Sequence, residues 1–215
     1  YPVVIFYIPD EGFPHAIFTF AGMVVGRAGV NVAGLTYGDI PVFEDNPENA
    51  VLKENMLIAF RSALYDLNRL NAMAEWVEES TYYRWHTYLL GDGRYESRGA
   101  KYTIKPDLRI LIRDNDDNDN YYPNVLSKVV YDADTPERAM SIFDYIETNY
   151  KQFDETHQYT LSQQGAIPGS NLMNLVIDAT SLIGYVAVAN EDDNGTLNDA
   201  STQEFIEYNF QSSLP

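Results

Sequence analysis

The sequence predicts a single α+β domain in which antiparallel sheets pack against helices. Three observations point to this class. The first forty residues alternate short apolar runs with turn residues, and residues 50–79 carry apolar side chains at intervals of three and four. Further strand and helix candidates then follow without strict βαβ alternation. Two sheets with apolar faces, covered by helices on the outside, suit this order.

The first strand candidates lie close together in the chain. Residues 3–8 form an apolar run that ends at a Pro-Asp-Glu-Gly turn, and residues 15–20 and 22–27 are predicted as the next two short strands. Residues 28–37 are predicted as a turn that leads into another strand, so we expect an antiparallel meander. Because the chain opens inside a strand with no methionine before it, we expect its first strand or strands to lie upstream of Tyr1.

Residues 50–79 have the periodicity of an amphipathic helix. Apolar side chains such as Phe60 and Leu64 recur at helical spacing through this stretch. Asn68 and Asn71 weaken its centre, because asparagine is unfavourable inside a helix. We therefore expect a break near these residues that divides the stretch into two helices.

The second half of the chain mixes strands and helices. A helix is predicted over residues 136–150, because Thr135 can cap it and Pro136 suits its first turn. Another is predicted over residues 123–130. No linker or domain boundary is visible, so residues 1–215 are predicted as one domain. The remaining strand candidates are residues 85–90, 100–104, 108–112, 172–178, 183–189 and 204–210.

Composition excludes several functional classes. The chain has no cysteine, which excludes a disulfide scaffold, a thiolate zinc site, an iron–sulfur cluster and a cysteine nucleophile within these residues. A net charge of −18 opposes binding to nucleic acid or to anionic membranes. No apolar run reaches the ~20 residues of a membrane-spanning helix. His15, His86 and His157 lie far apart and no phosphate-binding loop occurs, so we predict neither a metal nor a cofactor.

Residues 114–120 consist only of aspartate and asparagine. Alternating oxygen ligands are typical of calcium-binding loops, but the run lacks the glycine at the sixth position, and Val125 stands at the twelfth position, where an EF-hand has glutamate. A solvated acidic loop and a weak calcium or sodium site therefore both remain open.

A more specific pattern lies between Gly22 and Leu35. The Gly-Val-Asn-Val-Ala-Gly-Leu run at residues 29–35 resembles a G-x-N-x-x-G-L signature of two groups of N-terminal-nucleophile hydrolases: the choloylglycine hydrolases, and the penicillin-type acyltransferase and carcinine hydrolase family. The strand and turn at residues 2–12, and the runs at residues 89–93 and 168–172, resemble other segments of these proteins in the same order. The resemblance covers most of the chain and implies a four-layer αββα sandwich of two mostly antiparallel sheets.

The resemblance also implies a reaction. In these families an N-terminal Cys, Ser or Thr attacks the carbonyl of a linear amide, its own α-amine serves as base, and amide groups stabilise the oxyanion. Asn31 matches the asparagine of the signature, and Asn115 is the candidate for a second one. The residues alone leave alternatives: Asn31 also suits a turn beside Gly29, and Asn115 also suits a solvated loop. If Asn31 is a catalytic residue outside the core, its replacement by alanine should change the free energy of unfolding by no more than about 1 kcal/mol.

Two departures from the family pattern leave the activity open. Residue 1 is Tyr, which cannot replace the nucleophile, and the chain has no cysteine. In one interpretation the chain is a hydrolase or acyltransferase acting on linear amide C–N bonds through an acyl-enzyme, with its nucleophile outside these residues. In another it is a catalytically inactive αββα domain that binds a ligand or a partner. In a third it is an unrelated acidic binding module, and the match is chance.

Aromatic residues indicate where an acyl group would bind. Tyr83, Trp85 and Tyr122 are candidates to line a cleft for the acyl group of a small N-acyl amide substrate, and packing on a sheet face is the alternative. Homo-oligomers are common among such folds, so one is possible here. The acidic, cysteine-free composition fits an exported bacterial protein or a cytoplasmic one, with a slight preference for export.

Overall fold

A computed structural model describes residues 1–41, 56–79, 86–105, 108–114, 126–133 and 135–213. Its larger sheet is an antiparallel meander of seven strands, in which each strand pairs with its neighbours in the sequence. The register places Ile5 opposite Ile17 and Tyr7 opposite His15. The strands are β1 (Pro2–Tyr7), β2 (His15–Phe20), β3 (Ala28–Asn31), β4 (Leu35–Pro41), β5 (His86–Asp92), β6 (Arg98–Lys105) and β7 (Leu108–Arg113).

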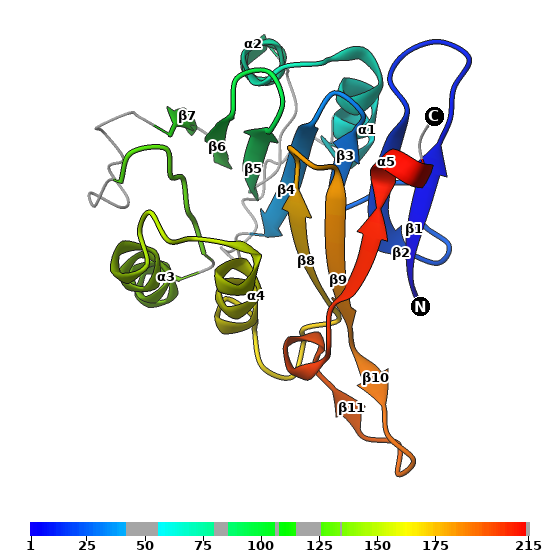
Figure 1. The fold of residues 1–215 in the computed structure, drawn as a ribbon, viewed down its shortest axis with the longest axis vertical. Helices are drawn as coiled ribbons and strands as arrows, with labels where there is room; N and C mark the ends of the chain where they lie inside the picture. The colour runs from blue at the N-terminus through cyan, green and yellow to red at the C-terminus, as the bar shows by residue number, and fades with distance from the viewer. Residues whose placement is uncertain (42–55, 80–85, 106–107, 115–125, 134, 214–215) are drawn as a thin grey trace.

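A smaller sheet is built from the last third of the chain. It has three antiparallel strands in the order β12, β9, β8, so the last strand lies beside the second strand of the β8–β9 hairpin. A short two-stranded ribbon continues from β9, and Figure 1 shows it projecting from the end of the sheet. The elements are β8 (Met173–Asp178), β9 (Ile183–Val188), β10 (Asn190–Glu191), β11 (Leu197–Asn198), the 3-10 helix η1 (Ala200–Thr202), β12 (Ile206–Asn209) and α5 (Phe210–Ser213).

Among the described residues, four longer helices lie outside the sheets: α1 (Met56–Asp66), α2 (Leu70–Glu79), α3 (Pro136–Thr148) and α4 (Glu155–Gln164). The expected break in the first helical stretch is confirmed and falls between α1 and α2. Asp92, buried at the end of β5, fixes this break, because its carboxylate accepts a hydrogen bond at 3.2 Å from the backbone N–H of Leu70, the first residue of α2. Within the described ranges, each helix is too short or too polar to cross a bilayer.

The two faces of the large sheet contribute to two separate cores. Alternate residues of β2 show this directly, since Ile17 packs against α1 and α2 whereas Ala16 and Phe18 pack against the small sheet. On the helix side, the ring of Phe60 from α1 stacks on Tyr37 of β4, with ring centroids 4.8 Å apart. The large sheet therefore separates the α1–α2 layer from the small sheet.

Helix α4 covers the other face of the small sheet. Tyr159 of α4 meets Tyr185 of β9 edge to face at 5.1 Å and stacks on Phe205 at 4.6 Å. Helix α3 packs against α4 and buries Ile142 and Phe143 in a third apolar cluster. The order of layers is helices, large sheet, small sheet, helices (Figure 1), which confirms the predicted four-layer αββα sandwich.

Two predicted elements differ from the structure, and one helix of the structure was not predicted. Residues 22–27 are a loop rather than a strand, and Gly22 adopts a φ of +91° there. The helix predicted at residues 123–130 is absent over 126–130, where Lys128 has a positive φ of 63°. Helix α4 was not predicted, because its sequence has no apolar stripe. Its start is instead specified by Asp154, which forms a capping box with His157.

A tight junction closes one end of the sandwich. Gly93, just after β5, lies against the backbone of the β8–β9 turn, and the Thr180 hydroxyl of that turn donates to the Gly93 carbonyl at 2.9 Å. The guanidinium of Arg94 donates to the carbonyl of Thr180 at 3.1 Å and to that of Val32 at 3.2 Å. The two sheets are thus held together by backbone contacts in addition to side-chain packing.

Replacing Gly93 by alanine should weaken this junction. The new Cβ would stand 2.4 Å from the carbonyl carbon of Ala179, and a backbone atom cannot move aside cheaply. We expect a loss of about 2 kcal/mol in the free energy of unfolding, measured by urea denaturation. Gly38→Ala in β4 is the matched control, because a Cβ there meets nothing within 4 Å. Equal midpoints for both variants would show that the junction is loosely packed.

Candidate functional site

Hydroxyl groups of the neighbouring strands bind backbone carbonyls of the loop between β2 and β3, residues 21–27. Thr19 donates to the carbonyl oxygen of Val25 at 2.6 Å, and Tyr37 donates to that of Gly26 at 2.8 Å. Both donors are buried. Burial raises the pKa of the Tyr37 phenol, so this group stays protonated and remains a donor.

A third carbonyl of the β2–β3 loop is fixed in the same way. The Tyr7 hydroxyl and the Arg61 guanidinium both reach the carbonyl oxygen of Val24, at 3.3 and 3.4 Å. The guanidinium also lies over the Tyr7 ring, 4.4 Å from its centroid. The side chains of Met23 and Val24 are 38% and 65% exposed. The loop is therefore anchored through its carbonyls and presents apolar side chains to solvent.

An ion pair fixes the end of the same loop. The guanidinium of Arg27 lies 2.9 Å from the carboxylate of Asp39, whose side chain is fully buried. The backbone N–H of Asp39 also donates to the Arg27 carbonyl at 2.8 Å. Because a buried carboxylate needs a partner for its charge, this pair ties the loop firmly to β4.

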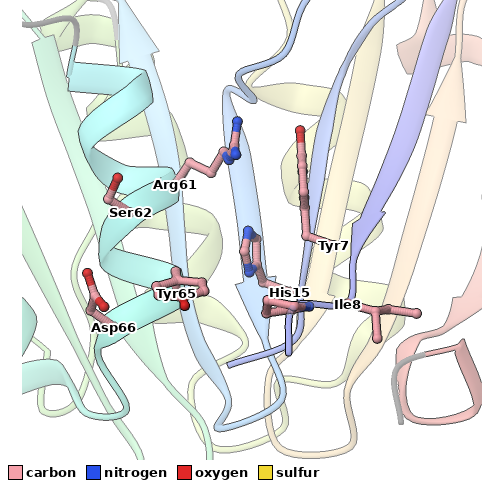
Figure 2. Close-up of a pocket in the computed structure, with 8 residues that line it drawn as sticks. Tyr7, Ile8, His15, Arg61, Ser62, Tyr65 and Asp66 are labelled. Carbon is pink, nitrogen blue, oxygen red and sulfur yellow. The ribbon is translucent and has the colours of Figure 1, made fainter. Parts of the chain in front are cut away.

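A hollow of about 300 Å³ lies next to this loop, between helix α1 and the turn that joins β1 to β2. Figure 2 shows side chains of α1 on one side of it and those of the strand pair on the other. We call it the α1 hollow. It is lined by Tyr7, Ile8, Pro9, His15, Arg61, Ser62, Tyr65 and Asp66.

His15 is the buried polar group of the α1 hollow, with 2% of its surface exposed. Its ring stacks on Tyr7, with centroids 4.9 Å apart, and its Nδ1 lies 2.9 Å from the carbonyl oxygen of Phe13. Burial lowers the pKa of His15, and the charge of Arg61 lowers it further, while the bond to Phe13 opposes both effects. Burial therefore favours the neutral imidazole.

Asn31 is fully buried at the end of β3, where its side chain joins the sheet to α1. The amide nitrogen donates to the carbonyl oxygens of Leu64 at 2.9 Å and Leu67 at 2.7 Å. The amide oxygen accepts from the backbone N–H groups of Ala33 at 3.1 Å and Leu35 at 3.0 Å. Both hydrogens and both lone pairs of the carboxamide thus have backbone partners.

The two glycines of the G-x-N-x-x-G-L run, Gly29 and Gly34, also help α1 to pack against the β3–β4 hairpin. A Cβ on Gly29 would stand 2.6 Å from the side chain of Leu64, and Gly34 turns the chain with a φ of +84°. The signature therefore docks the end of α1 on the β3–β4 hairpin. Asn31 lies in the core, which corrects the expectation that it is a non-core residue whose removal would cost little stability. For Asn31 to reach an oxyanion, one of its two donor bonds would have to break, and its catalytic role stays a prediction.

The other predicted site residues lie outside the described part of the chain. These are Asn115, Tyr83, Trp85 and Tyr122, and so is most of the acidic run at 114–120. Among the described residues, no group of three His, Asp or Glu side chains is placed to hold a metal ion. Sequence reasoning did not pair His15 with Arg61, because the two are distant in the chain. The alternation along β2, which puts His15 on the Ile17 face, is the signal that directs it toward α1.

Replacing Asn31 by alanine should destabilise the fold strongly. The variant would leave two carbonyls and two N–H groups unpaired in the core, so we expect a loss of about 3 kcal/mol or more in the free energy of unfolding. Asn31→Asp should be at least as damaging, because a carboxylate cannot donate to Leu64 and Leu67. Asn194→Ala, in an exposed turn, is the control and should change little. A change below about 0.5 kcal/mol for Asn31→Ala would refute the anchoring role.

Comparisons with known proteins bear on the fold. No protein-family model and no curated protein sequence matches this chain. Among solved structures, a variant of the conjugated bile acid hydrolase from Clostridium perfringens superposes with a TM-score of 0.62 at 10% identity, covering 100% of this chain and 90% of that one. Penicillin V acylase from Agrobacterium tumefaciens superposes with a TM-score of 0.58 at 10% identity, covering 83% and 67%.

A third similar structure is the Caenorhabditis elegans ortholog of N-acylethanolamine-hydrolyzing acid amidase. Its TM-score is 0.57 at 10% identity, with 87% of this chain and 80% of that one covered. At such identities the likeness concerns the fold. The chain has the αββα fold of N-terminal-nucleophile hydrolases, and the resemblance seen in the sequence is confirmed at that level.

Proposed function

We propose that this chain is the bulk of a hydrolase or acyltransferase that acts on linear amide C–N bonds, with its nucleophile outside these residues. The observation that carries the proposal is the shared fold. Three structures that match at least 83% of the chain are named for the hydrolysis of conjugated bile acids, penicillin V and N-acylethanolamines. All three are amide hydrolases or acylases, although their substrates differ.

The proposed reaction has two steps, formation of an acyl-enzyme and its breakdown. A Cys, Ser or Thr nucleophile adds to the amide carbonyl carbon, and hydrogen-bond donors stabilise the oxyanion that forms. The proton of the nucleophile passes to its own α-amine and from there to the leaving nitrogen. The C–N bond then breaks, the amine leaves with that proton, and the acyl group stays on the nucleophile. Water or another amine finally attacks the acyl-enzyme, which gives a carboxylic acid or a new amide. By resemblance, Asn115 is proposed as an oxyanion donor, and Asn31 is proposed to act chiefly by positioning the β3–β4 hairpin.

We further propose that the acyl group contacts the β2–β3 loop. Met23 and Val24 offer exposed apolar surface on a backbone that is anchored at three successive carbonyls. A surface that is already ordered loses little conformational entropy when a ligand binds. Tyr83, Trp85 and Tyr122 are proposed to complete the acyl pocket, on the basis of the sequence alone. A small N-acyl amide is the proposed substrate class.

The activity can be tested on the full-length native protein. The substrates are glycocholate, penicillin V and an N-acylethanolamine, with release of the amine as the assay. We expect turnover of at least one of them, and a transient mass increase of the protein equal to the acyl group in quenched samples. Binding without turnover or adduct would favour the inactive ligand-binding domain. The absence of both binding and turnover would overturn the proposal.

The variant Val24→Asp tests the role of the β2–β3 loop. Placing a charge against the acyl chain should raise KM about fivefold or more, with a smaller effect on kcat, because ground-state binding is lost. Leu197→Asp in β11 is the matched control, since Leu197 is a similarly exposed apolar residue at 53%. An unchanged KM in Val24→Asp, or an equal rise in both variants, would remove the loop from the acyl site.

A further inference from the structure

We propose that the α1 hollow binds a small aromatic or aliphatic carboxylate that also carries an O–H or N–H donor. The inference rests on two polar side chains that line the hollow, those of His15 and Arg61. It requires no amide-cleaving activity, so it stands or falls independently of the proposed function.

The tautomer of His15 follows from its one hydrogen bond. Nδ1 lies 2.9 Å from the Phe13 carbonyl oxygen, and a carbonyl can only accept, so Nδ1 carries the hydrogen. In the neutral ring Nε2 is then a bare acceptor. This atom is buried and has no hydrogen-bond partner among the described residues. Because an unpaired buried acceptor is costly, a ligand that donates an O–H or N–H to Nε2 would gain binding energy.

Arg61 supplies the complementary group. Its guanidinium makes one long bond to Val24 and lies over the Tyr7 ring, and no carboxylate of the described residues forms an ion pair with it. This is notable in a chain with 32 acidic and 14 basic residues. A guanidinium offers five donors in a planar fork that matches a carboxylate. An anionic ligand group could therefore bind Arg61 without displacing an internal ion pair.

The shape and the remaining lining narrow the class of ligand. A volume of about 300 Å³ is at the small end for ligand sites, which suits a compact molecule. The rings of Tyr7 and Tyr65, with Ile8, provide apolar walls for a planar or aliphatic body. Asp66 also lines the hollow, and its carboxylate opposes a second negative charge on the ligand. A monocarboxylate fits these groups better than a phosphate does.

The test uses 4-hydroxybenzoate as the probe, because it combines a carboxylate, a ring and an O–H donor. Binding is measured by calorimetry and by amide chemical shifts on the full protein. We expect saturable binding, about tenfold weaker binding of benzoate, which lacks the donor, and similar weakening for phenol, which lacks the charge. Equal affinity for all three compounds, or no saturable binding, would overturn the proposal. The absence of saturable binding would mean that the hollow holds water only.

Variants locate the binding. Arg61→Gln should weaken 4-hydroxybenzoate about tenfold, whereas Arg69→Gln, which removes the same charge from an exposed position outside the hollow, should not. His15→Phe keeps a ring next to Tyr7 and should reduce the affinity for 4-hydroxybenzoate to that for benzoate, with benzoate unaffected. Equal effects of the two arginine variants would assign binding to general charge and overturn the site.

A spectroscopic readout keeps the proposal testable if His15→Phe fails to fold. In the wild-type protein the ¹⁵N resonance of the His15 Nε2 should be that of an imidazole nitrogen without an attached hydrogen. Addition of 4-hydroxybenzoate should shift this resonance, and addition of benzoate should leave it nearly unchanged. A protonated Nε2 in the free protein, or equal shifts with both probes, would contradict the inference.

Discussion

The carboxamide of Asn31 is the contact on which the rest of the structure depends. It sits at the end of β3, binds the last turn of α1 through two donors and the β3–β4 turn through its oxygen, and is fully buried. Asp92 makes the corresponding contact for α2, by accepting from the N–H of Leu70. Helix ends carry unpaired backbone groups that must find partners when they are buried. Asn31 and Asp92 supply these partners where α1 ends and α2 begins. The two side chains therefore determine where both helices lie on the sheet.

This docking determines the geometry around the β2–β3 loop. Helix α1 brings Arg61 to the carbonyl of Val24 and to the ring of Tyr7, and the same helix forms one wall of the α1 hollow. The strands contribute Thr19 and Tyr37, whose hydroxyl groups hold the next two carbonyls of the loop. A shift of α1 along the sheet would therefore alter the loop and the hollow together. In this chain the G-x-N-x-x-G-L run encodes this docking, so the motif by itself is evidence of architecture.

The sequence was sufficient for much of the fold and for less of the site. Apolar runs bounded by turn residues located β1 and β2, and helical spacing located α1 and α2 with their break. The sequence-based prediction failed at residues 22–27, where an apolar run forms a loop whose carbonyls bind distant side chains. It also missed α4, because the start of this helix is specified by a polar cap rather than by an apolar stripe. For Asn31 the sequence located an important residue, but a turn, a core anchor and an oxyanion donor all use the same side chain. Only its four partners, two of them at the end of a distant helix, identify the anchor.

The most direct test of this account is the hydrogen exchange of the two side-chain amide hydrogens of Asn31, followed by NMR in D₂O. If the carboxamide is buried and bonded to α1, both hydrogens exchange as slowly as the backbone amides of the central strands, through opening of the core alone. Exchange as fast as that of the exposed Asn194 side chain would contradict the account, because Asn31 would then be open to water and α1 would be docked by other contacts.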